Sequence, residues 1–387
     1  MPGHRSTIVG VGAVTGYGWG SASLWEGLRS GQPAARRVPG YGTNPGEPGW
    51  VALVPDGGRA GDGPTRFARA LRAAVREAVE DATGRGWRPR RVGLVHAAVL
   101  GEVDLLRDFY LAHGGSLPVR DYLYLMPSTP VSLLMQEFGF RGPALQVSAM
   151  CASGNAGLLT AQAWLDAGIA DDVVVVATDL SAGPEHVRAF VRLGVAVTDA
   201  EPLDACRPFQ EGSRGFTMGE AAASFVLSRG EGGGRPYVVA HGGAMTHDAY
   251  HVTSIDPALT AVRECVRVAL ADAGVPGSAV AYLHAHGPGT AQCDRAEAAM
   301  LAEFLGGDAG IYSVKPLVSH CQGAASAVEI VATALAYEHG VIPAPPAVAP
   351  AHPRLLSGPT ALSGGLTLKT SLGMGGHNSA VVLGPAA

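Results

Sequence analysis

The segment ALQVSAMCASGNAGLLTAQAWLDAG, residues 144–168, decides the fold of this chain. Its first residues alternate between apolar and polar side chains, which predicts a buried strand that ends near Met150. Apolar residues over 158–165 recur with helical spacing, and Gly168 is a typical helix stop. Cys151 therefore stands at a tight turn between a strand and a helix.

A cysteine at such a turn has two interpretations. A helix start offers unpaired N–H groups and the positive end of the helix dipole, which favour a thiolate. The small residues after Cys151 leave room for a substrate carbonyl, and backbone N–H groups there could hold an oxyanion. A cysteine in an apolar stretch is otherwise a small buried hydrophobic residue. Residues elsewhere in the chain must decide between a nucleophile and a core position.

The composition limits the class of protein. The 387 residues allow two ordinary domains or one large double one, and 47% hydrophobic with 16% charged residues indicates a large core. A net charge of −5 gives no reason to expect a nucleic acid or membrane partner, and no apolar run reaches transmembrane length. The chain opens on an expected strand without a signal-peptide pattern, and its five cysteines lack paired or metal-type spacing. We therefore expect a cytoplasmic protein with reduced thiols.

An internal repeat organises the chain. Residues 75–97, a helix and then a strand, have a counterpart at 266–285, and the strand–turn–helix unit of the opening stretch recurs at 313–339. Alternating strands and helices imply largely parallel, buried sheets covered by helices. We predict an α/β protein of two similar halves, 1–235 and 236–387, with its site in a crevice between them.

Two histidines of the second half stand at expected strand ends. His286 lies in the glycine-rich turn HGPGT, and His320 lies in KPLVSHCQGAA just before a helix. A lone histidine at a strand end is often merely hydrogen-bonded, and we interpret His284 as structural. No third ligand has the spacing of a metal site.

Cys151 and the two histidines form a chemically coherent set. A thiolate accepts an acyl group from a thioester. Two neutral imidazoles, His286 and His320, can then stabilise the enolate formed when a malonyl thioester loses carbon dioxide. Lys315, five residues before His320, could hold the electrostatics of that pair in place.

Six motifs follow one another along nearly the whole chain. In order, they are TIVGVGAVT (7–15) with Trp25 and Leu28, VSAMCASG (147–154), RPF (207–209) with RGF (214–216) and Gly219-Glu220, HGPGT (286–290) with Asp294 and Glu297, Lys315 to His320 with Gly323-Ala-Ala325, and GMGGHN (373–378). Such motifs are weak singly and strong in this order. Together they resemble the β-ketoacyl-(acyl carrier protein) synthase family, which are condensing enzymes of the thiolase superfamily.

The resemblance implies a fold, a site and partners. The fold would be the thiolase fold, two pseudo-repeated βαβαβ halves in five layers, α-β-α-β-α. Cys151, His286, His320 and Lys315 would be catalytic, with Glu297 orienting the lysine. Substrate contacts would come from Thr290, Leu372, Met374 and Gly375. The chain would need no metal or organic cofactor, and would form a homodimer or a heterodimer with a related subunit. An acyl carrier protein would deliver acyl and malonyl-type thioesters on its phosphopantetheine arm.

Departures from the family pattern indicate a specialised synthase. Pro288 stands where a hydroxyl residue usually contacts the pantetheine arm, Ser319 and Ser326 replace glycines, Gln210 replaces an aspartate, and Leu372 and Met374 stand where phenylalanines are common, one of them a gate to the acyl pocket.

Three functions remain open at this point. We expect decarboxylative Claisen condensation of an acyl group on Cys151 with a malonyl-type thioester, in polyketide or specialised fatty-acyl biosynthesis. A non-elongating acyltransferase on the same scaffold is the first alternative, and the altered pantetheine contact favours it. A non-catalytic partner subunit of a ketosynthase heterodimer is the second, which the presence of Cys151 and both histidines disfavours.

Overall fold

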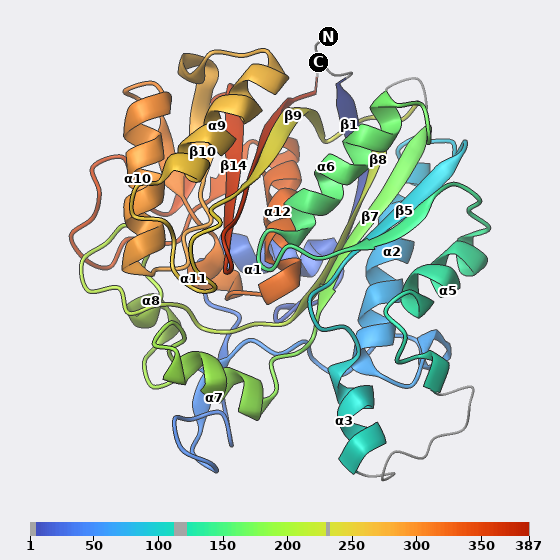
Figure 1. The fold of residues 1–387 in the computed structure, drawn as a ribbon, viewed down its shortest axis with the longest axis horizontal. Helices are drawn as coiled ribbons and strands as arrows, with labels where there is room; N and C mark the ends of the chain where they lie inside the picture. Colours follow the sequence, from blue (N-terminus) through green and yellow to red (C-terminus); the bar gives the residue numbers. More distant parts are fainter. Residues whose placement is uncertain (1–4, 112–121, 230–232, 387) are drawn as a thin grey trace.

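A mixed eleven-stranded sheet forms the frame of the protein (Figure 1). The computed structural model describes residues 5–111, 122–229 and 233–386. The strands of this sheet are β1 (Ser6–Thr15), β2 (Gly18–Trp19), β5 (Val92–Ala97), β6 (Ala144–Val147), β7 (Asp172–Asp179), β8 (Ala221–Ser228), β9 (Val238–His247), β10 (Val280–His284), β11 (Gly310–Tyr312), β14 (Leu366–Gly373) and β15 (His377–Pro385). The remaining short strands are β3 (Arg36–Val38), β4 (Gly49–Val51), β12 (Val341–Pro343) and β13 (Pro359–Ala361).

The order of the strands has a mirror arrangement. Across the sheet it is β11-β10-β14-β15-β9-β1-β8-β7-β5-β6, with β2 paired to β1. The centre is the antiparallel pair β1–β9, and outward from it β8, β7, β5 and β6 correspond to β15, β14, β10 and β11. Each half contributes one wing of the sheet, as the internal repeat predicts.

The expectation of a largely parallel sheet is wrong for the middle of the sheet. β5 is parallel to β6 and β7, and β10 is parallel to β11 and β14. The strands between them, from β7 through β8, β1, β9 and β15 to β14, are antiparallel. The three-residue loop 374–376 joins β14 to β15, and so short a connection permits only an antiparallel pair.

Helices occupy three layers around the two wings. The long helices are α2 (Arg66–Gly84), α6 (Ser153–Asp166), α9 (Thr260–Ala273), α10 (Ala291–Phe304) and α12 (Ala325–His339). The others are α1 (Ser21–Ser30), α3 (Val103–Leu111), α5 (Thr129–Phe138), α7 (Pro184–Arg192), α8 (Pro202–Ala205) and α11 (Lys315–Val318), with 3-10 turns η1 (Ala60–Asp62), η2 (Gly277–Ala279) and η3 (Gln322–Ala324). Figure 1 shows α6 and α12 between the wings, with α2 and α9 on the outer faces. The result is the predicted α-β-α-β-α layering.

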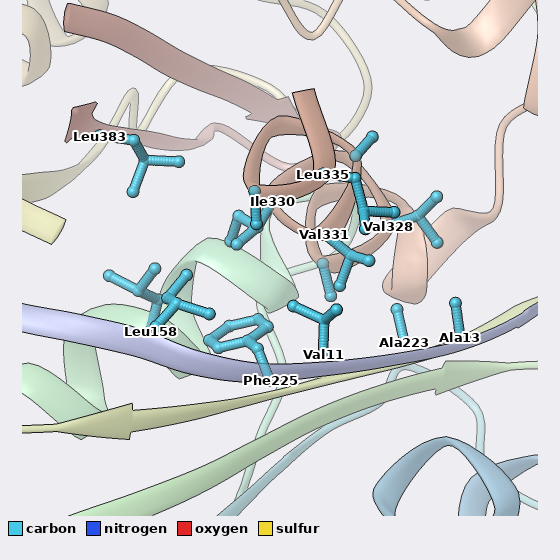
Figure 2. Close-up of a cluster of buried hydrophobic side chains, with 14 of the residues drawn as sticks. Val11, Ala13, Leu158, Ala223, Phe225, Val328, Ile330, Val331, Leu335 and Leu383 are labelled. Carbon is cyan, nitrogen blue, oxygen red and sulfur yellow. The ribbon is translucent and has the colours of Figure 1, made fainter. Parts of the chain in front are cut away.

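The central layer contains the largest hydrophobic core. Leu158 of α6 and Val331 of α12 lie against β1 and β8, where Val11 and Phe225 point inward (Figure 2). Residues on the opposite face of β1, such as Val9, pack with α2 in a separate core. A sheet covered on both faces needs strands without polar alternation, which explains the apolar runs of β1 and β7.

The two central helices touch at their starts. A Cβ on Gly154 would lie only 2.3 Å from the backbone nitrogen of Ala327, so glycine is what permits this contact between α6 and α12. Because Cys151 precedes α6 and His320 precedes α12, the contact brings the two residues to one place.

Strand β6 differs from its prediction as a buried strand. It is the last strand of the sheet, and its side chains are exposed or half-buried, with Leu145 46% exposed. Leu145 therefore faces outward in the single chain, whereas Val147 packs against the central core. Among the described helices, none combines the length and apolar character needed to cross a bilayer.

Candidate active site

The turn that carries Cys151 is tightly fixed. Met150 has a φ of 50°, a left-handed conformation that is uncommon for a residue with a side chain. Ser153 Oγ accepts a hydrogen bond from the Ala149 amide at 2.9 Å and donates one to the Met150 carbonyl at 2.6 Å. Cys151 lies two residues before the start of α6 and is 6% exposed. Strained turns of this kind are typical of functional sites.

The thiol is more difficult to ionise than the helix start alone predicts. Burial raises the pKa of Cys151 to about 11, although Lys315 and two backbone amides oppose the shift. The prediction of a favoured thiolate counted the helix start and omitted the loss of water around the sulfur. The resting residue is therefore a thiol at neutral pH.

Two backbone amides lie against the sulfur. They belong to Cys151 itself and to Met374, in the loop between β14 and β15. Two N–H groups that converge beside a nucleophile can bind the oxygen of a tetrahedral intermediate. The sequence indicated the first amide, but only the fold shows the second.

His286 is held by a buried carboxylate at the end of β10. Glu297 accepts hydrogen bonds from the amides of His286 and Gly287, at 2.6 and 2.8 Å, and from Thr370 Oγ1 at 2.6 Å. The helix α10 thus fixes the turn through a side chain, and Glu297 supports His286 rather than Lys315.

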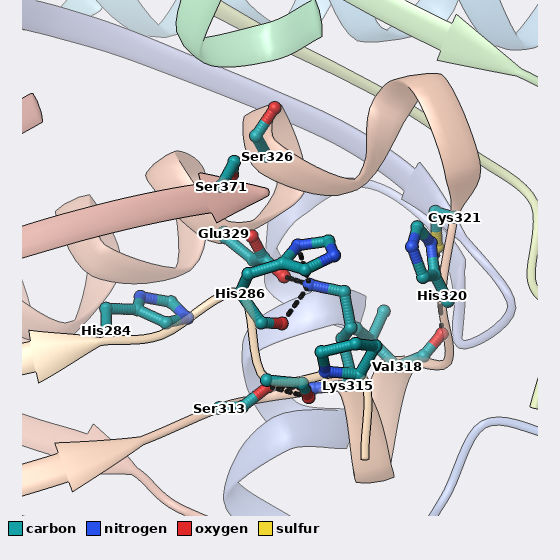
Figure 3. A network of polar contacts seen from close by, with 12 residues as sticks. His284, His286, Ser313, Lys315, Val318, His320, Cys321, Ser326, Glu329 and Ser371 are labelled. Carbon is teal, nitrogen blue, oxygen red and sulfur yellow. Dashed lines mark hydrogen bonds and ion pairs between the residues drawn. The ribbon is translucent and has the colours of Figure 1, made fainter. Parts of the chain in front are cut away.

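Lys315 connects His286 to a different carboxylate. Its Nζ lies 3.2 Å from His286 Nδ1 and also contacts the His286 carbonyl and Glu329 of α12 (Figure 3). Glu329, and not the expected Glu297, is therefore the acidic partner of Lys315. Glu329 is the only charged residue within 325–336, and this was the sequence signal for it.

His320 follows α11, and a hydrogen bond from the backbone orients its ring. Ser319 before it has a φ of 69°, and His320 Nδ1 accepts a hydrogen bond from the Gln322 amide at 3.0 Å. The rings of His286 and His320 are nearly perpendicular, with centroids 5.4 Å apart. Burial and the nearby lysines hold the pKa of both histidines well below the usual value, so both are neutral.

The hydrogen bonds fix which nitrogen carries the proton. In each neutral ring Nδ1 acts as the acceptor, toward Lys315 in His286 and toward the Gln322 amide in His320. The proton therefore resides on Nε2 in both rings. Side-chain atoms of Cys151, His286 and His320 lie within 4.8 Å of one another. The sequence grouped these three residues by their chemistry, although no spacing typical of a metal site linked them. The two imidazoles present N–H donors rather than lone pairs to the centre.

A cavity of about 190 Å³ opens onto these three residues. All four predicted substrate contacts are in its wall: Thr290, Leu372, Met374 and Gly375. Pro288 lines it too. His284 is not in this wall, and its Nδ1 lies 2.8 Å from Thr333 Oγ1. The sequence interpretation missed Gln322 and Cys293 in this wall, and nothing in their local pattern marked them.

Comparison with known proteins shows which family models and relatives this chain matches. Residues 64–232 match the model "Beta-ketoacyl synthase, N-terminal domain", and residues 237–348 match "Beta-ketoacyl synthase, C-terminal domain". The tetracenomycin polyketide synthase ketoacyl synthase alpha subunit of Streptomyces glaucescens is 31% identical over 366 residues, which is 88% of this chain and 86% of the relative. Nodulation protein E of Rhizobium meliloti (strain 1021) is 29% identical over 359 residues, 88% of each chain.

Solved structures share the fold. One is a type II PKS acyl-carrier protein in complex with its ketosynthase bound to the hexaketide, with a TM-score of 0.87 and 22% identity over 99% of this chain and 100% of the other. Another is the ishigamide ketosynthase/chain length factor, with a TM-score of 0.84 and 24% identity over the whole of both chains. At these identities the likeness establishes the fold.

Proposed function

Because this chain belongs to the β-ketoacyl synthase family of acyl-transferring condensing enzymes, we propose that it catalyses decarboxylative Claisen condensation with Cys151 as the nucleophile. The observation that carries the proposal is the convergence of Cys151 with two neutral histidines at one cavity, each histidine with its proton on Nε2. The reaction requires no metal or organic cofactor, since the phosphopantetheine belongs to the carrier protein.

The first step transfers an acyl group to the enzyme. Cys151 sulfur attacks the thioester carbonyl, and the amides of Cys151 and Met374 hold the resulting oxyanion. The carrier thiolate leaves and takes up the proton that Cys151 loses, so the step has no net proton change. A thiol with a pKa of about 11 needs this coupling, because little thiolate exists beforehand.

The second step extends the chain. A malonyl-type thioester loses carbon dioxide, and its enolate oxygen accepts hydrogen bonds from the Nε2–H groups of His286 and His320. The enolate carbon then attacks the acyl carbonyl. The bond to Cys151 breaks, and the departing thiolate takes one proton from solvent, which is the proton that decarboxylation of a carboxylate consumes overall. The products are a β-ketoacyl thioester, carbon dioxide and the free enzyme.

Polyketide biosynthesis is the setting that the relatives favour, since one of them is a ketoacyl synthase alpha subunit of a polyketide synthase. An acyl carrier protein would supply both thioesters through the cavity. The five cysteines, all free, are consistent with a cytoplasmic location. Pro288 in the cavity wall keeps the non-elongating acyltransferase as the second candidate.

We further propose that a second subunit of the same fold pairs with strand β6. This edge strand carries the exposed Leu145. An unpaired, apolar sheet edge favours association with another strand. A structural relative is a ketosynthase with a chain length factor, so the partner is either a second copy or a related chain.

Two histidine variants test the reaction. His286→Ala and His320→Ala should still form acyl-Cys151, seen as a mass increase of the intact protein. Both should release labelled carbon dioxide from malonyl-carrier protein a hundredfold to a thousandfold more slowly, which is on the order of the loss of one oxyanion donor. Wild-type protein that decarboxylates no malonyl-type thioester, yet passes its acyl group to an amine or alcohol, would establish the transferase instead. Wild-type protein that never acylates Cys151 would indicate a partner subunit.

A further inference from the structure

A second lysine lies buried beneath the histidine pair. Lys369 is on β14, directly beside His284 of β10 in the sheet register, and its side chain is fully buried. Its Nζ lies 2.8 Å from Glu329 Oε2 and 3.1 Å from Ser371 Oγ, and it also contacts the Thr370 carbonyl. The condensation steps above make no use of this side chain.

Glu329 therefore serves two ammonium groups at once. Its Oε1 is paired with Lys315 and its Oε2 with Lys369. One carboxylate cannot balance two buried cations, so a second is needed nearby. Glu297 is that group: burial raises the pKa of its carboxyl, but the hydrogen bonds from Thr370 and the two amides, together with the charge of Lys369, oppose that shift and favour the carboxylate.

The four charges balance only when Lys369 is present. Without it, Glu297 and Glu329 would face Lys315 alone, and one uncompensated negative charge would remain under His286. A buried negative charge favours the imidazolium form of a neighbouring histidine. The groups facing His286 are Lys315 from α11, Glu329 from α12, Glu297 from α10, Lys369 from β14, His320 from the turn after α11, and Cys151 from the turn before α6.

We propose that Lys369 is a positioning residue that keeps His286 neutral, and therefore keeps its Nε2–H available to the enolate, by balancing the second buried carboxylate. Lys315 cannot do this alone, because its ammonium is already engaged by Glu329 and by the ring it supports. Lys369 is among the groups that lower the pKa of His286 and of His320, after burial and Lys315. This inference rests on the donor role proposed for His286.

The test separates charge from hydrogen bonding. Lys369→Gln retains a donor toward Thr370 and Ser371 but removes the charge, and Lys369→Arg retains the charge. Histidine labelled at carbon ε1 reports ring protonation by NMR, with His286→Ala to assign the signal. Between about pH 5 and 8, His286 should remain neutral in the wild type and in Lys369→Arg. In Lys369→Gln its pKa should rise by on the order of one unit.

The pH dependence of turnover gives a second measurement. The acidic limb of carbon dioxide release should move to higher pH in Lys369→Gln, while acylation of Cys151 stays unchanged. The double variant Lys369→Gln/Glu329→Gln removes one charge of each sign and should return both the His286 pKa and the acidic limb toward wild type. A merely structural lysine would show no such rescue.

The outcomes are distinct from those that test the condensation itself. A folded Lys369→Gln protein in which His286 begins to protonate at no higher pH than in the wild type would overturn the proposal. If Lys369→Gln does not fold, Lys369→Met with its own Glu329→Gln partner makes the same comparison. The NMR titration needs no turnover, so wild-type protein without decarboxylase activity would contradict the proposed reaction and leave the effect of Lys369 measurable.

Discussion

Burial raises the pKa of Cys151 and the amide groups at the helix start lower it, and burial has the larger effect. The other cysteines are shifted further, since burial raises the pKa of Cys265 to about 12 and raises those of Cys206, Cys293 and Cys321 beyond it. Cys151 is thus the most acidic of five weakly acidic thiols, and sequence could identify it as the candidate nucleophile without giving its ionisation.

Alkylation of Cys151 should accordingly be selective and steeply dependent on pH. Because its pKa lies above the working range, the thiolate fraction should increase about tenfold for each pH unit between pH 7 and 9. Brief labelling with iodoacetamide, followed by peptide mapping, measures the rate at each site. Equal labelling of Cys206 or Cys265, or a rate that does not change with pH, would contradict this ordering.

Ser319 and Ser326 stand where the family has glycines, and replacing each by glycine should change the free energy of unfolding in opposite directions. Ser319 has a φ of 69°, and its Oγ is buried without a hydrogen-bond partner among the described residues. Ser326 lies within the buried helix α12, where its Oγ accepts a hydrogen bond from the Asn155 amide at 3.2 Å. Ser319→Gly should raise the free energy of unfolding by about 1 kcal/mol through relief of strain.

Ser326→Gly is the matched control and should lower that free energy by about 1 kcal/mol or more, since it loses a hydrogen bond and places glycine in a helix. Urea unfolding of both variants beside the wild type gives the two values. A loss of stability in Ser319→Gly would show that its backbone conformation is not strained.

At the scale of elements, the contact between α6 and α12 determines whether the site assembles. Sequence predicted both helices and their repeat relation, because apolar spacing is a local property. It could not predict that Glu329 rather than Glu297 pairs with Lys315, since that choice depends on how α12 and α10 face the β10 turn. The antiparallel pairing in the middle of the sheet was also missed, because strand direction depends on how distant segments pack together.

Gly154→Ala tests this helix contact. The added methyl group would lie 2.3 Å from the Ala327 amide nitrogen, and backbone cannot move aside as a flexible side chain does. Overpacking of this kind typically costs about 1–3 kcal/mol, and separating the helices should move Cys151 away from His320. We expect a lower melting temperature and a loss of carbon dioxide release larger than the loss of acylation. Gly168→Ala, at the far end of α6, is a control for stability alone.

In the whole molecule, the central strands of the sheet are paired on both sides, whereas β6 is an edge strand with one unpaired side. Sequence predicted the layers and the family, and the structure and comparisons confirm both. The division at residue 235 stays a prediction. The outward side of β6 could not be foreseen, because an apolar strand has the same pattern whether its cover comes from its own chain or from another.

Leu145→Asp should therefore weaken the proposed subunit pairing without disturbing the core. A charge at an edge strand opposes pairing with a second strand, and Leu145 is 46% exposed in the single chain. Sedimentation velocity should show a smaller species than the wild type, with helical content unchanged. Val348, which is 45% exposed on another part of the surface, provides a control for surface charge: Val348→Asp should leave the mass in solution as it was.

The mirror order of the strands places two similar units in one chain. Two identical chains of this plan, related by a two-fold axis between α6 and α12, would present the same loop twice, and neither copy could change without changing the other. One chain that holds both units is free of that constraint, so the loop before α6 carries a thiol and its counterpart before α12 carries an imidazole.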